Sequence, residues 1–189
     1  MRRSLLLALA LLAPGFASAA GSALPDDFNA LFAMTCMKHF YSQDELREAM
    51  NAQSDGVLSG EQAKYFLQGS PGTAWSVTAP SAKYVVALRD DTLCLVFAQR
   101  AVSSAVQRGF VALVSSAPDP LVAIKLNDPS LGPNRGTTRT IAYSWGRPED
   151  DSELLFTLTT TDDVDATTQA LASMALVNKL GNPPKVKPH

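Results

Sequence analysis

The spacing of the apolar residues changes near residue 73, and this change is the strongest constraint on the fold. Before it, apolar side chains recur every three or four residues, as they do along one side of a helix. After it, the period is mostly two, as in strands, apart from one helical stretch that opens at Ser104. This order predicts an α+β fold, in which helices pack on one face of a mainly antiparallel sheet.

Three helices are expected in the first part of the chain. The first begins after Asp26, which is a plausible N-cap, and carries its apolar side chains as far as Phe40. Capping-box sequences begin the second at Ser42 to Glu45 and the third at Ser59 to Gln62. A glycine- and proline-rich stretch then ends the third helix before the period changes.

We expect about six to seven strands after this point, with the later helix between them. Residues 166–178 fit either a helix or a strand, and we favour a final strand. Residues 92–99 are apolar on both faces, with Cys94, Val96 and Ala98 pointing one way and the alternate residues the other, which predicts a central strand covered on both sides. The other expected strands are 73–79, 83–89, 121–126, 137–146 and 153–161.

The N-terminal segment has the order of a secretory signal peptide. Two arginines precede an uncharged apolar run, and the small residues "ASAA" follow it. We therefore predict a signal peptide at residues 1–19, a single domain at 20–180 and a disordered, proline-rich tail at 181–189. The residue directly after the expected cut is not a cysteine, and no second apolar run could span a membrane, so we expect a periplasmic or secreted protein without a lipid anchor.

The net charge of the chain bears on whether it binds nucleic acids or anionic membranes. The sequence has 16 basic and 18 acidic residues, and without Arg2 and Arg3 the balance is 14 to 18, or a net charge of −4. Nucleic-acid binding and docking on anionic membranes both need a basic face. Neither partner is therefore expected.

Residues with catalytic or metal-binding potential are few. Of the two histidines, His189 lies in the predicted tail, so only His39 could serve a Ser or Cys nucleophile, and no G-x-S-x-G sequence occurs. Cys36, His39 and Cys94 together give three zinc ligands at most. We predict no catalytic residue, metal or cofactor; the alternative is a small hydrolase or lyase that uses carboxylates alone, such as the acidic group at 149–153.

The two cysteines favour a disulfide. Cys36 shares the apolar side of the first helix, and Cys94 lies in a strand that such a helix should cover. In an oxidising compartment an even cysteine count favours pairing. The sequence therefore predicts a Cys36–Cys94 bond that fastens the first helix to the sheet and leaves His39 at the edge of a packed face.

A binding function is the leading hypothesis for this chain. Trp75, Trp145 and Tyr143 fall on predicted strands, where they could form an exposed platform or could simply be core residues. Arg135 lies in the long loop at 127–139. We predict a non-enzymatic binding protein that uses these residues and this loop to contact a protein or small-molecule partner.

Four segments together resemble a family of uncharacterised small exported proteins and lipoproteins of proteobacteria. They are the helix with Cys36, "YFLQGSPGTAW", "YVVALRDDTLCLVFAQ" and "LLFTLTTT". The resemblance implies export and a single domain, but no activity and no catalytic residues. Unlike the lipoproteins of that family, this chain lacks a lipobox cysteine.

Overall fold

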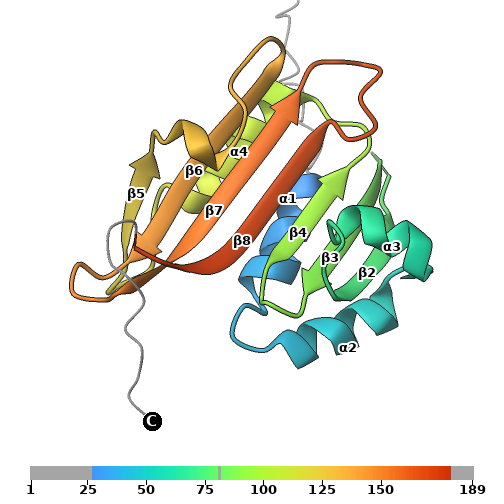
Figure 1. Cartoon of the computed structure of the whole chain (residues 1–189), viewed down its shortest axis with the longest axis horizontal. Coiled ribbons are helices and arrows are strands. Elements are labelled where there is room, and N and C mark those ends of the chain that lie inside the picture. The colour runs from blue at the N-terminus through green and yellow to red at the C-terminus, as the bar shows by residue number, and fades with distance from the viewer. Residues whose placement is uncertain (1–26, 81, 180–189) are drawn as a thin grey trace, which may run out of the picture.

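One antiparallel sheet of eight strands and four α-helices make up the described part of the chain (Figure 1). This computed structural model describes residues 27–80 and 82–179. The predicted α+β class is confirmed, with eight strands rather than six to seven. The predicted signal peptide and the predicted tail lie outside the described residues.

The strands form two meanders that meet at the centre of the sheet. Their order is β1-β2-β3-β4-β8-β7-β6-β5, so the last strand of the chain pairs with β4. The crossover between the meanders contains helix α4. The strands are β1 Gly56–Val57, β2 Gly72–Thr78, β3 Lys83–Arg89, β4 Cys94–Ala98, β5 Val122–Leu126, β6 Thr138–Gly146, β7 Ser152–Thr161 and β8 Ala170–Asn178.

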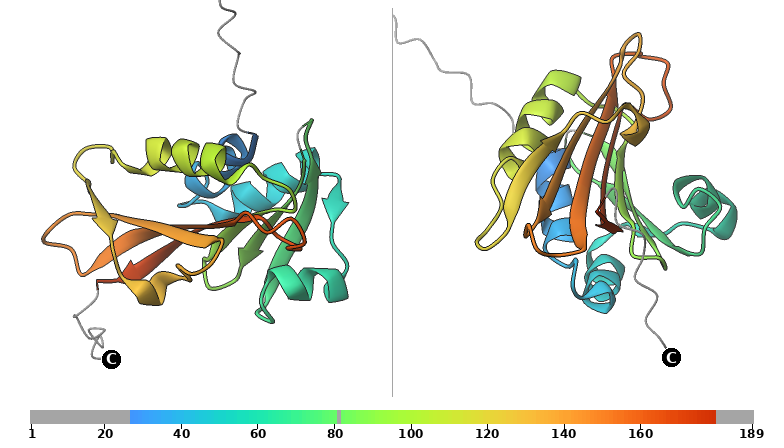
Figure 2. Two further views of the ribbon diagram at one scale, coloured as in Figure 1. Left: turned by 90° about the horizontal axis from the view of Figure 1, so that it is seen from above. Right: turned by 60° about the vertical axis from the view of Figure 1, so that its left-hand side comes forward.

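Helices lie on both faces of the sheet, which corrects the prediction of a single covered face (Figure 2). One face carries α1 (Asp27–Phe32), its π-helical continuation η1 (Ala33–Met37), α2 (Gln43–Gln53) and α4 (Ser103–Val114). The opposite face carries the short α3 (Gly60–Phe66), and the 3-10 turn η2 (Pro129–Leu131) lies on that side as well. Helix α3 is on that face because a second group of apolar side chains on β2, β3 and β4 points there.

The larger of two apolar cores lies between the sheet and the helices α1, α2 and α4. It unites both meanders, because side chains of β2 to β4 and of β6 to β8 contribute to it. Its largest fully buried side chains include Phe28, Phe32, Trp75, Phe110 and Phe156. The smaller core lies under α3, where Ala63 and Leu67 pack on the other face of β2, β3 and β4.

The central strand and the last strand agree with the sequence analysis. All five residues of β4 are buried; Cys94, Val96 and Ala98 belong to the larger core, while Leu95 and Phe97 belong to the smaller one. Residues 170–178 form a strand, as favoured. The unexpected strand is β1, which has only two residues and pairs with β2. A segment this short has no measurable period.

The predicted disulfide is confirmed. Cys36 of η1 is bonded to Cys94 at the start of β4, with the two Cα atoms 5.5 Å apart. Both residues are buried in the larger core. The bond therefore fastens the first helical segment to the central strand of the sheet. In the described residues, no helix has the length and apolar character needed to cross a membrane.

Candidate functional site

The predicted aromatic platform is wrong, because its aromatic residues belong to the core. Trp75 is 0% exposed and Trp145 is 9% exposed, and Tyr143 is also buried. The indole of Trp75 donates a hydrogen bond to Asn51 Oδ1 of α2 at 2.8 Å, and that of Trp145 donates to the Val114 carbonyl of α4 at 2.7 Å. Alternation along β2 and β6 turns these side chains toward the helices, where they hold α2 and α4 on the sheet.

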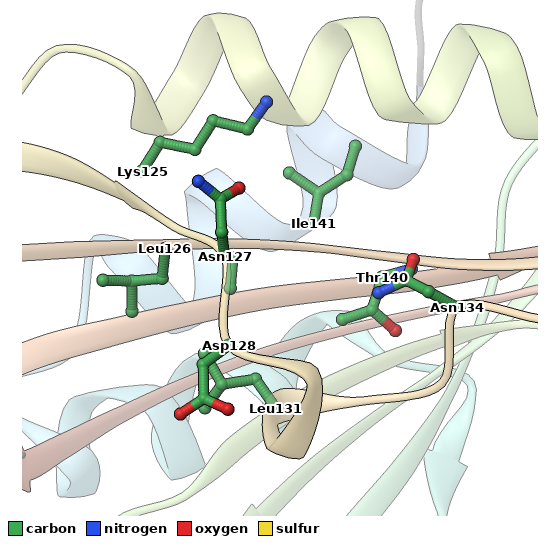
Figure 3. Close-up of a pocket in the computed structure, with 9 residues that line it drawn as sticks. Lys125, Leu126, Asn127, Asp128, Leu131, Asn134, Thr140 and Ile141 are labelled. Atoms are coloured by element: carbon green, nitrogen blue, oxygen red, sulfur yellow. The ribbon is translucent and has the colours of Figure 1, made fainter.

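The loop between β5 and β6, by contrast, lies at the surface. Arg135 is exposed in it, and a pocket of about 380 Å³ opens where the loop leaves β5. Figure 3 shows Lys125, Asn127 and Ile141 extending to one side of the two strands, and Leu126, Asp128 and Leu131 to the other. The predicted contact loop therefore surrounds a hollow at the edge of the sheet.

Hydrogen bonds hold this loop in one conformation. Asn134 Oδ1 accepts from the backbone N–H of Thr140 at 2.9 Å, and Thr140 Oγ1 donates to the Pro133 carbonyl at 2.9 Å. Thr140 Oγ1 also lies 3.0 Å from Thr159 Oγ1 of β7. Gly132 approaches so closely that a Cβ there would lie 2.8 Å from Thr140 Cγ2. The loop is thus fastened to β6 and β7 at its C-terminal half.

Asp128 caps the turn η2 in the N-terminal half of the loop. Its Oδ1 accepts from the backbone N–H of Ser130 at 2.8 Å, and this hydrogen bond lowers the pKa of the Asp128 carboxyl. The Asp128 side chain lines the pocket and stays charged at neutral pH. The hollow therefore has one basic residue, Lys125, and one acidic residue, Asp128, among its described lining.

Strand β5 beside this loop is an edge strand with exposed apolar side chains. Val122 is 47% exposed and Ile124 is 52% exposed. Ala123 packs against the larger core, so alternation directs Val122 and Ile124 to the face away from the helices. On that face their cross-strand neighbours are Gly146 and Ser144, which are small. An apolar strip therefore lies at the edge of the sheet, next to the fastened loop.

The acidic group at 149–153 lies mainly on the turn between β6 and β7. Arg147 donates two hydrogen bonds to the Asp150 carboxylate, both at 3.0 Å, and lies 3.7 Å from Glu149. The hydrogen bond to Asp150 raises the pKa of Arg147. Glu149 and Asp151 are exposed on this turn. The arrangement fixes the conformation of the turn, and nothing in it desolvates a carboxylate for acid–base chemistry.

His39 lies beside the disulfide at the edge of the packed face. Its side chain is largely buried, and Nδ1 is 3.5 Å from Glu45 Oε2, which is an ion-pair distance but too long for a good hydrogen bond. Among residues 27–80 and 82–179, no three His, Cys, Asp or Glu side chains gather closely enough to hold a metal ion. His39 therefore has one carboxylate neighbour, Glu45, and its nearby cysteines are bonded to each other, so the described residues here do not form a metal site.

The exposure of Val122 and Ile124 could not be predicted from the sequence, because "LVAIKL" is apolar on both faces apart from Lys125. Alternation shows which side chains share a face, but it does not show which face a helix covers. The one available signal was the position of this segment between α4 and a long loop.

Comparisons of the chain with protein-family models, with curated proteins and with solved structures found no match. Function is therefore inferred from the geometry of the described residues.

Proposed function

We propose that this is an exported, non-enzymatic binding protein that docks a protein partner on β5 and the loop at residues 127–136. The observation that carries the proposal is the pair of exposed side chains, Val122 and Ile124, on the edge strand of an eight-stranded sheet. We call this area, with the loop residues Asn127 to Gly136, the β5 surface.

Edge strands present backbone N–H and C=O groups that can pair with another chain. Natural proteins usually protect such edges with charges, bulges or prolines. In β5 the only charged residue is Lys125, which pairs across the sheet with Tyr143 on the helix-covered side. An extended segment of a partner could add to this edge through backbone hydrogen bonds and cover Val122 and Ile124 with its own side chains.

The fastened loop supports the same proposal. A preorganised surface loses little conformational entropy when a partner binds, so more of the contact energy appears as affinity. The hydrogen bonds of Asn134 and Thr140 and the cap at Asp128 give the loop this property.

Export is the second part of the proposal, and the disulfide supports it. Disulfides persist in oxidising compartments and are rare in the cytosol. The Cys36–Cys94 bond is therefore consistent with a protein that works outside the cytoplasm.

Photo-crosslinking in the native host tests the β5 surface directly. A photoreactive phenylalanine at Ile124 should give a discrete adduct with a protein partner, whereas the same residue at Val164, which is 68% exposed in the β7–β8 loop, should give none. Adding Val122→Asp should reduce the Ile124 adduct at least about tenfold, because a charge then faces the apolar contact.

Circular dichroism serves as the control for folding, since Val122 and Ile124 are both half-exposed. Equal adducts from Ile124 and Val164, or no adduct from Ile124, would refute the proposed surface. An adduct of twice the chain mass would replace the foreign partner with a second copy of this chain.

A further inference from the structure

A second hollow, distant from the β5 surface, lies beside α3 on the same face of the sheet. Its volume is about 410 Å³, within the range of small-molecule sites. It is formed by α3, by β3 and β4, and by Thr167 and Thr168 of the loop before β8. Figure 1 shows α3 in front of β2 and β3, at the opposite end of the sheet from β5. We call it the α3 pocket.

The wall of the α3 pocket is aromatic. Phe66 of α3 packs edge-on against Phe97 of β4, with ring centroids 5.0 Å apart and an interplanar angle of 73°. Tyr65 packs edge-on against Phe66 at 5.1 Å and is 60% exposed. Such an arrangement offers both ring faces and ring edges to an aromatic ligand.

The hollow exists because α3 is too short to cover its face of the sheet. The helix has seven residues, and Ala63 and Leu67 pack on the buried positions of β2, β3 and β4. Beyond this contact Val85 of the same face is only half-buried, and Tyr65 of α3 is largely exposed. These two side chains are the part of the pocket wall that another molecule could cover.

Lys83 supplies a positive charge at this wall. It is the one charged residue among the described lining of the pocket, and alternation places it on the same face of β3 as Val85. In the described part of the chain no carboxylate lies within ion-pair distance of its ammonium group. Gln99 of the neighbouring chain segment also lines the pocket, and its backbone N–H donates to the Lys83 carbonyl at 3.4 Å.

We infer that the α3 pocket binds a small aromatic carboxylate. The ring of such a ligand would cover Val85 beside Tyr65 and Phe66, and its carboxylate would accept hydrogen bonds from Lys83 and from the side-chain amide of Gln99. An ammonium at the edge of an apolar wall favours an anion over its neutral analogue, because only the anion can accept a hydrogen bond between two charged groups. This inference concerns a different surface from the proposed partner site and does not depend on it.

The test uses indole-3-acetate and its neutral amide, indole-3-acetamide, as probes of residues 20–189, the chain expected after cleavage of the predicted signal peptide. In two-dimensional amide NMR spectra, millimolar indole-3-acetate should shift the signals of residues 62–66, 83–85 and 97–99. The neutral amide should bind about tenfold more weakly, since it lacks the charge that Lys83 would meet.

Two variants separate the charge from the aromatic wall. Lys83→Gln should lower the affinity for indole-3-acetate about tenfold and leave the affinity for the neutral amide unchanged. The control Lys125→Gln changes an exposed strand lysine at the other end of the sheet and should alter neither affinity. Tyr65→Ala should weaken both probes, and the fold should persist because Tyr65 is exposed.

Two kinds of result would contradict the inference. Shifts that are absent, or scattered over the surface, would overturn the pocket as a binding site. Equal affinity for the anion and the amide, or no effect of Lys83→Gln, would overturn the assignment of the ligand as a carboxylate.

Discussion

Gly72 begins β2 at a point where the backbone of β3 comes unusually close. It pairs with Arg89, and its φ of 152° is one that side chains rarely adopt. A Cβ at this position would lie 2.8 Å from Arg89 Cα and would also overlap the Leu88 carbonyl oxygen. Both neighbours are backbone atoms of a buried strand, so they cannot move aside.

Gly72→Ala should therefore lower the free energy of unfolding by about 2 kcal/mol or more. Gly60→Ala is the matched control, because nothing lies within 4 Å of a Cβ there and its φ is ordinary. That change should raise the stability by about 0.5 kcal/mol, since alanine has less freedom in the unfolded chain. Equal effects of the two substitutions in denaturant unfolding would show that the close approach at Gly72 is unimportant.

At the scale of single residues, the sequence predicted correctly which cysteines pair and which side chains of a strand share a face. It did not predict which of those faces is exposed to solvent. The alternation of β4 correctly assigned Cys94 and Val96 to one face, and the helical spacing around Cys36 placed both sulfurs in reach of each other. The same alternation could not show that Trp145 lies under α4, because a strand period does not reveal which face is covered. The aromatic platform was wrong for this reason, while the exposure of Arg135 followed from its loop.

Among the elements, η1 and β4 are joined by a disulfide, which links the first helical segment to the sheet through its side chains. The Cys36–Cys94 bond closes a separation of 58 residues. A link over this distance restricts the unfolded chain strongly, and the chain-entropy estimate of its contribution is about 4 kcal/mol.

The double substitution Cys36→Ala and Cys94→Ala should therefore lower the free energy of unfolding by about 4 kcal/mol, as measured in denaturant. Wild-type protein kept reduced should unfold at nearly the same denaturant concentration as this variant. Titration of unfolded, unreduced wild-type protein should detect no free thiol. Two free thiols would show that the bond does not form, and a change below about 1 kcal/mol would show that it constrains little.

Elements with a regular period or a cap were predictable, and those without either were not. The capping box at Ser59 is present, with the Gln62 side chain accepting from the Ser59 backbone N–H at 3.3 Å. The two residues of β1 became a strand only because β2 offers them a partner. Likewise α3 left the expected face because Ala74, Ala87 and Leu95 form an apolar site for it, which depends on contacts between distant segments.

For the whole molecule, the larger core predicts one cooperative unit. Its side chains come from both meanders and from α1, α2 and α4, so neither meander buries its apolar face without the other. Gly72→Ala in the first meander should then reduce the amide protection of β6 and β7 by the same free energy as that of β3. Native-state hydrogen exchange measures this, and a loss confined to β1 to β4 would show that the two meanders unfold separately.

The pairing of β4 with β8 also sets when the sheet can be completed. A ribosome releases the chain from its N-terminus, so β4 emerges long before Ala170–Asn178, the segment that must lie against it. Until that last segment has been made, β4 is an edge strand whose apolar side chains lack the neighbour that covers them in the folded protein. The β4 side of the sheet therefore gains its last neighbour only when almost the whole chain has been made.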